Sequence, residues 1–345
     1  MFGKIGPLVA TALFLSAEIL TAHELLLRGG LATGEHQPFF TASQKKDDLF
    51  GTGLAGATDG ALSGTWRSDT LRSLPLYLGY VHPDSYYAAF DFYFQESNFS
   101  RSSLYNTRIS GNDGQLAGRE RLEKYRLKKQ ILEAGYRLQL DSPIILFAGV
   151  REWSASGDFT GKSRGSGVFA GQREFLGGHI QPGSGLSLET IAPLAGLRSH
   201  FKTGPVELAL ALRFFSGTGS YRENATTSFY NTGFGVLAAQ TAIRQTTASM
   251  KEQGFDLQLD VDYPLAENLS LFGGIGYEAT EVRLENMLSI HLLERESFFQ
   301  ERTASHRSDF LVFDETEFLH DRLTYARQSG HTILLRFGVA SKIGL

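Results

Sequence analysis

The chain has 345 residues, a net charge of −4 and no cysteine, which excludes disulfides and thiolate metal sites. This charge balance provides no general basic face, so we expect no nucleic-acid partner. No internal run of about 18 or more apolar residues occurs, which excludes a bundle of membrane-spanning helices. A β-barrel passes that test, because only alternate residues of its strands face lipid.

The N-terminus has the pattern of a secretory signal. A short positive segment ends at Lys4, Ile5 to Leu15 are apolar, and small residues follow up to Ala22. We therefore expect a signal peptide at residues 1–22 and a mature domain at residues 23–345. The alternative is a buried N-terminal helix, which Pro7 and Glu18 disfavour.

After the signal, apolar and polar residues alternate with period two in segment after segment. This pattern is typical of strands with one apolar and one polar face. We expect about ten strands, because both termini then lie on one side of a barrel and the count must be even. In chain order they fall near residues 24–33, 71–81, 86–95, 132–140, 144–154, 186–201, 206–214, 255–263, from 269 onward, and 333–345.

The clearest strand is Phe255 to Tyr263. Its odd-numbered positions are all apolar or aromatic, and its even-numbered positions are Asp256, Gln258, Asp260 and Asp262. The final segment, from Ile333 to the end of the chain, has the same alternation. Both segments indicate a wall with lipid on one side and polar groups on the other.

The predicted connections alternate between short and long. Tight turns fall at residues 82–85, 141–143, 203–205 and 264–268, and long polar loops at 34–70, 100–124, 161–185, 217–249 and 285–322. This asymmetry favours periplasmic turns and outward loops over a β-sandwich. Twelve strands are the alternative, because residues 229–239 or 309–318 could hold another hairpin.

By this pattern the chain resembles bacterial outer-membrane β-barrel proteins, which commonly end in an amphipathic strand. The resemblance implies an all-β, transmembrane, antiparallel up-and-down barrel in the outer membrane of a Gram-negative-type bacterium. It also implies contact with outer-membrane lipid and lipopolysaccharide, and assembly by the barrel assembly machinery. The extracellular ligand stays unknown.

The polar positions predict the residues that line the lumen. Mixed charges on facing strands could pair into a network that fills a narrow interior, or the Asp256, Asp260 and Asp262 row could line a cation-preferring water path. The predicted lumen-lining residues are Asp91, Glu133, Arg137, Glu207, Arg213, Asp256, Asp260, Asp262, Arg336 and Lys342.

Two short motifs suggest chemistry but lack its structural context. Gly51 to Gly56 fits G-x-G-x-x-G, and Gly161 to Gly165 fits G-x-S-x-G, yet both lie in predicted polar loops without an adjoining helix. We interpret both as loop sequence. The titratable residues of segment 285–322 have no ligand-type spacing, so we interpret them as exposed: His291, Glu294, Glu296, His306, His320 and Asp321.

Segment 285–322 also holds many apolar residues, which would be costly to expose. It could cover the barrel mouth, extend the last two strands as a hairpin, or present a contact surface. Helix-compatible spacing over residues 286–296 favours a small lid.

A ten-stranded cylinder with long outer loops is similar to the omptin surface proteases. Their paired acidic and Asp/His motifs do not occur here at matching places, so protease activity is not carried over. We expect a monomeric, non-enzymatic barrel without cofactor or metal, with a structural or binding role at the cell surface. A narrow porin-like channel is the alternative, and a hydrolase at the rim is the third possibility.

Overall fold

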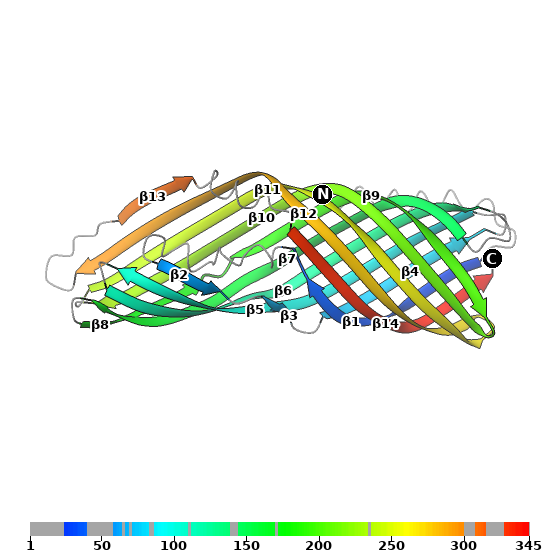
Figure 1. Ribbon diagram of the computed structural model, residues 1–345, viewed down its shortest axis with the longest axis horizontal. Coiled ribbons are helices and arrows are strands. Elements are labelled where there is room, and N and C mark those ends of the chain that lie inside the picture. Colours follow the sequence, from blue (N-terminus) through cyan, green and yellow to red (C-terminus); the bar gives the residue numbers. More distant parts are fainter. Residues whose placement is uncertain are drawn as a thin grey trace.

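The computed structural model describes residues 24–39, 58–63, 66–68, 71–82, 86–109, 112–138, 144–169, 172–233, 236–299, 308–314 and 328–344. Their strands pair antiparallel in one sheet that closes on itself (Figure 1). The ring consists of β1 (Glu24–Gln37), β4 (Leu71–Val81), β5 (Tyr86–Ile109), β6 (Asn112–Arg137), β7 (Ile144–Phe169), β9 (Gly185–Thr203), β10 (Val206–Gly233), β11 (Val236–Ala266), β12 (Leu269–Phe299) and β14 (Gln328–Gly344).

Closure occurs where the last strand meets the first. β14 pairs with β1 from Glu24↔Gly344 to Gln37↔His331, so no strand of the ring is left with an open edge along this seam. A closed sheet satisfies its backbone hydrogen bonds internally, as lipid requires. The predicted antiparallel barrel of about ten strands is therefore confirmed.

Four shorter strands lie off the simple ring. β2 (Thr58–Ser63) and β3 (Arg67–Ser68) pair with β5, and β13 (Ser308–Asp314) pairs with β12. β8 (Gln172–Ile180) lies between β7 and β10 and continues the line of β9. The break between β8 and β9 includes Gly183 at φ 89°, a left-handed conformation that glycine adopts readily. No helix in the described part of the chain is long and apolar enough to cross a membrane.

The short connections gather at one end of the barrel, together with the end of β14 (Figure 1). Gly204, at φ 60°, turns β9 into β10. The predicted turn at 264–268 is shorter than expected, because β11 continues to Ala266 and β12 starts at Leu269. Of the other two predicted turns, residues 83–85 of the first and the whole of the second, 141–143, lie outside the described residues.

The predictions of long loops were mostly wrong. Residues 100–109, 112–124, 217–233 and 236–249 are continuous strand, and β7 and β8 occupy most of 161–180. Part of 34–70 is strand as well, in β1, β2 and β3. These stretches appeared loop-like because their sequences are rich in polar residues and lack the continuous apolar face of a lipid-facing strand.

Segment 285–322 is partly strand, so the helix-compatible spacing at 286–296, which favoured a small lid, does not correspond to a helix. β12 runs through to Phe299, and β13 returns along it from Ser308 to Asp314. Of the three interpretations, the backbone matches the extended hairpin, although the returning strand pairs with β12 and not with β14. The predicted signal peptide at 1–22, the Gly51 to Gly56 motif, His306, His320, Asp321 and Leu345 lie outside the described residues.

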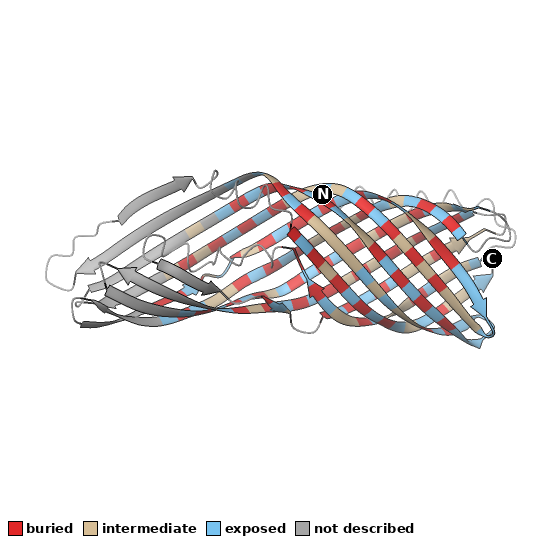
Figure 2. Ribbon diagram, in the orientation of Figure 1, coloured by how far each residue is buried: buried red, intermediate tan, exposed pale blue. Residues whose placement is uncertain are grey.

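Burial alternates along most of the strands whose side chains are described (Figure 2). The polarity of the two faces reverses partway along the barrel. Near the short turns the outward side chains are exposed and apolar, and we call this band the apolar belt. It includes Leu27, Leu31, Leu76, Leu146, Val150, Phe214, Leu257, Leu259, Val261, Leu271, Ile275, Leu335, Phe337 and Val339. A closed barrel with such a belt has the architecture of an outer-membrane protein, and lipid covers the belt.

Beyond the belt the arrangement is reversed. The outward side chains become polar or charged, as at Arg126, Lys128, Lys251 and Gln253, while most of the large inward ones become aromatic or aliphatic. The belt covers about nine residues of β11, which is what a tilted strand needs to cross a bilayer. The remainder of this 31-residue strand therefore continues outside the membrane as a water-facing barrel with an apolar interior.

Tight packing at the seam should make barrel closure sensitive to added volume. A Cβ at Gly30 would lie 2.2 Å from the Phe337 carbonyl oxygen, whereas one at Gly276 would meet only Leu334 Cβ at 3.8 Å. We expect Gly30→Ala to lower the free energy of unfolding by about 1–3 kcal/mol, and Gly276→Ala to change it by less than about 1 kcal/mol. Urea titration followed by heat-modifiable gel migration measures both, and equal stabilities would contradict this packing.

Candidate functional site

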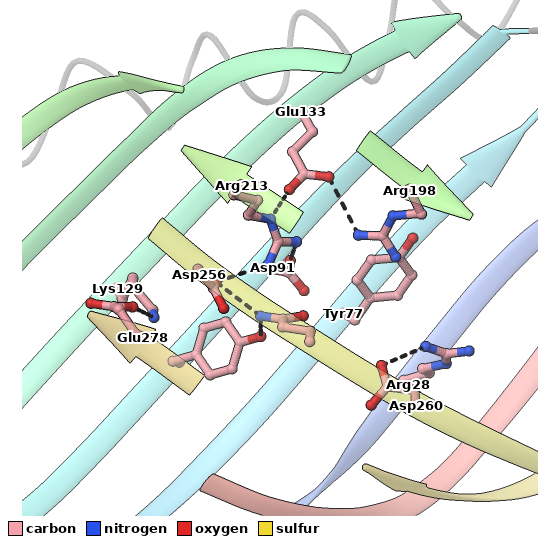
Figure 3. Close-up of polar contacts among 12 residues, drawn as sticks. Arg28, Tyr77, Asp91, Lys129, Glu133, Arg198, Arg213, Asp256, Asp260 and Glu278 are labelled. Atoms are coloured by element: carbon pink, nitrogen blue, oxygen red, sulfur yellow. Dashed lines mark hydrogen bonds and ion pairs between the residues drawn. The ribbon is translucent and has the colours of Figure 1, made fainter. Parts of the chain in front are cut away.

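The charged layer of the interior is the main candidate site. It lies inside the barrel at the level of the belt and reaches the outer edge of the belt, and Figure 3 shows several of its contacts. Its described members are six bases and seven acids from nine strands. They are Arg28, Lys129, Arg151, Arg198, Arg213 and Arg336 with Asp91, Glu133, Glu252, Asp256, Asp260, Asp262 and Glu278. We refer to this set as the charged layer.

Arg213 is the centre of this layer. Its side chain, 1% exposed, extends from β10 and donates hydrogen bonds from all three guanidinium nitrogens. Nε pairs with Glu133 on β6, Nη2 with Asp91 on β5, and Nη1 with Asp256 on the adjacent β11 at 3.1 Å. One guanidinium thus connects the walls on opposite sides of the lumen.

Arg198, from β9, lies beside this centre. It approaches Glu133 at 3.4 Å, and its guanidinium lies 5.2 Å from the ring centroids of both Tyr77 and Tyr87. The Tyr87 hydroxyl donates to Glu133 at 3.0 Å. Cation–π contacts and the shared carboxylate hold this second arginine in place.

Toward the short turns, the acids of β11 are paired with arginines of the two strands that form the seam. Arg28 of β1 contacts Asp260 at 3.1 Å and also pairs with Asp262. Arg336 of β14 donates to Asp260 at 2.8 Å. Because these aspartates have arginine partners, they do not form an open negative row in the described interior.

Toward the outside, Arg151 of β7 pairs with Glu252 at 2.8 Å and with Glu278 at 2.5 Å. Lys129 also pairs with Glu278. The second oxygen of Glu252 accepts hydrogen bonds from the Trp153 indole and the Thr190 hydroxyl, both at 2.8 Å. Buried carboxylates are tolerated where the donors around them are this complete.

A second, apolar layer fills the interior next to the charged layer, on the side away from the short turns. It contains large aromatic rings, among them Phe99 and Tyr125, which pack edge to face with centroids 5.3 Å apart. His36 stacks on Tyr125 at 5.7 Å and forms a 2.8 Å hydrogen bond with Thr332. We call this cluster the apolar plug: Phe39, Trp66, Phe99, Leu122, Tyr125, Leu127, Trp153, Ala155, Phe159, Ile180, Leu186, Leu188, Tyr221, Ala225, Ala248, Met250, Val282 and Leu284.

The free space between these groups is small. One cavity of about 30 Å³ lies between the charged layer and the apolar plug, lined by His36, Lys129, Arg151 and Trp153 among others. Another of about 20 Å³ lies beside Arg28, Arg198 and Arg336. Each has room for only one or two waters.

The predicted lumen residues fall into two groups. Asp91, Glu133, Arg213, Asp256, Asp260, Asp262 and Arg336 are buried members of the charged layer. Arg137, Glu207 and Lys342 lie at the end with the short turns and are half-buried, with Lys342 and Glu207 paired at 2.5 Å.

Sequence reasoning missed the remaining members, which are Arg28, Lys129, Arg151, Arg198, Glu252 and Glu278. Alternation held a signal for Arg28, which lies between Leu27 and Gly29 and faces opposite to Leu27 and Leu31. Lys129 and Glu252 gave no such signal, because the outward residues beside them, such as Lys128 and Lys251, are charged as well.

The other candidate chemistry does not converge in the described residues. Ser163, of the Gly161 to Gly165 motif, is buried within strand β7 and so lies neither in a loop, as predicted, nor at a strand-to-helix turn. His291, Glu294 and Glu296 belong to β12. Among the described residues, no group of three or more His, Asp or Glu side chains is placed to hold a metal ion.

Comparison with known proteins identifies no family. No family model matches the sequence, and no curated protein matches it. Among solved structures, the chain is similar to the outer-membrane protease OmpT of Escherichia coli (10% identity, 94% of this chain and 99% of that one, TM-score 0.46). It is also similar to the translocator domain of the autotransporter NalP of Neisseria meningitidis (11%, 98% and 95%, TM-score 0.29). These likenesses extend no further than the barrel fold.

Removing the central base should be costly, because three buried carboxylates would lose a shared partner. We expect Arg213→Met to lower the free energy of unfolding by about 3–5 kcal/mol, and Arg283→Met, whose side chain is 45% exposed, by less than about 1 kcal/mol. Adding Glu133→Gln to Arg213→Met should recover part of the loss. Urea unfolding in detergent tests this, and equal losses in the two single variants would refute the central role of Arg213.

Proposed function

We propose that this protein is a closed, non-enzymatic outer-membrane barrel with a structural or binding role at the cell surface. The observation that carries the proposal is the double obstruction of the interior. Paired charges fill the lumen at the level of the belt, and the apolar plug fills it above. A barrel of about ten strands is also narrow compared with the 16–18 strands of aqueous porins.

The alternative, a narrow cation channel, required an accessible row of acids. Asp256 pairs with Arg213, and Asp260 and Asp262 pair with Arg28. Ions passing here would have to displace these partners and then cross the apolar plug. Both steps oppose conduction, which supports the closed barrel.

The outward extension of the barrel favours a role at the surface. More than half of each of β10, β11 and β12 lies beyond the belt, where the described outward side chains of the wall are mostly polar. In this proposal the specificity lies in that extension and its tips. The third possibility, a hydrolase at the barrel rim, would need two titratable side chains within hydrogen-bond reach of each other beside a cleft. It is not part of this proposal.

Planar bilayer recordings test the closed barrel. We expect no stepwise current from the wild-type protein, and none from Trp153→Ala, because the charged layer would still block the lumen below an opened plug. An aqueous porin in the same bilayer serves as the positive control. Stable open steps from the wild-type protein would refute the proposal in favour of a channel.

A further inference from the structure

One strand of the outer extension carries an outward column of cations. On β6, Arg119, Arg121, Lys124, Arg126 and Lys128 are all exposed, while Leu122, Tyr125 and Leu127 between them are buried in the apolar plug. We call these five residues the basic column. It stands out on a chain whose net charge is −4.

The basic column begins where the apolar belt ends. Lys128 lies opposite Phe94 in the β5–β6 register, and four pairs closer to the short turns Leu132 lies opposite Phe90 and Val150. From Lys128 to Arg119 the strand rises by about 20 Å, given a strand tilt of about 40°. The column therefore starts at the membrane surface and continues outward.

The neighbouring strands add to the positive charge. Lys162 of β7 lies opposite Arg119, and Arg164 lies one pair further out, opposite Ala117; both are exposed. Among the described side chains of β5, β6 and β7, the outward acids in the same area are Glu96, Glu123, Glu152 and Asp158, with Glu123 placed 3.6 Å from Arg121. These three strands thus carry seven outward bases and four outward acids here in their described part, so this surface is positive overall.

A local irregularity in β6 keeps the cations outward. Lys124 has a left-handed backbone at φ 53°, and its N–H donates to the Asn98 side chain at 3.0 Å. This bulge places one additional residue between Leu122 and Tyr125, so that both stay inside while Arg121 and Arg126 both stay outside. A lysine rarely adopts this conformation without cost, and the surrounding sheet holds it there.

We propose that the basic column binds the phosphate groups of lipopolysaccharide in the outer leaflet. This inference rests on the proposed placement in the outer membrane. Phosphate accepts hydrogen bonds from lysine and paired ones from arginine. Ordinary phospholipid headgroups add only about 5–8 Å to each side of the hydrocarbon core. The greater height of the column fits a lipid whose sugars carry phosphates at several levels.

Binding of purified rough lipopolysaccharide that retains a phosphorylated inner core to the full-length mature barrel in non-ionic detergent tests this. The test variant is Lys124→Gln with Arg126→Gln. The matched control is Lys251→Gln with Arg283→Gln, which removes one exposed lysine and one exposed arginine from β11 and β12. We expect affinity to fall at least about tenfold in the test variant and to change less than about twofold in the control.

Two further probes identify the source of the phosphate. Chemically dephosphorylated lipopolysaccharide should bind the wild-type protein as weakly as the intact lipid binds the test variant, and inorganic pyrophosphate alone should not compete at equal concentration. Equal losses in the test and control variants, or unchanged binding of the dephosphorylated lipid, would overturn the assignment. Heat-modifiable migration and bilayer recordings of the test variant report separately on the closed barrel, so failure of one proposal is distinguishable from failure of the other.

Discussion

The structure depends on one constraint: a single closed sheet has to satisfy its own backbone hydrogen bonds while its two faces meet different surroundings. Alternation sends every second side chain inward. At the level of the belt, lipid takes the apolar face, so the polar face has to be filled from within, and Arg213 with Glu133, Asp91 and Asp256 does this. Above the belt, water takes the outer face and the same alternation places rings such as Phe99 and Tyr125 inside.

This reversal explains how a narrow barrel extends far beyond the membrane. The part beyond the membrane is stabilised mainly by an apolar core, as a water-soluble barrel is. The membrane-spanning part is stabilised by ion pairs inside a wall whose outer face meets lipid. The two kinds of filling meet near Trp153, which packs in the apolar plug and donates its indole N–H to Glu252 of the charged layer. Since both parts are filled, the surface available for recognition is the outer wall, where the basic column of β6 lies.

The fold could be predicted from the sequence because the belt strands have a clean period of two. Residues Leu71 to Val81 are strand β4 with the bounds that alternation indicated, and Asp260 and Asp262 face inward between Leu259, Val261 and Tyr263. The outer extension could not be predicted in the same way, because its polar and apolar faces are exchanged and the bulge at Lys124 interrupts the period. The ion pairs could not be predicted from the sequence, for another reason. That Arg213 meets Glu133 and Asp91 depends on the register of strands far apart in the ring, which local patterns do not encode.

Spin-label accessibility tests the central reversal most directly, and the chain has no native cysteine to interfere. Labels on single cysteines placed at Leu257 and Leu335, in the belt, should collide with lipid-dissolved oxygen and be protected from a water-soluble nickel complex. Labels at Lys251 and Gln253, outward on β11 beyond the belt, should show the opposite preference. If the labels at Leu257 and Leu335 prefer the nickel complex in a reconstituted bilayer, lipid does not cover the belt and this account of the barrel is wrong.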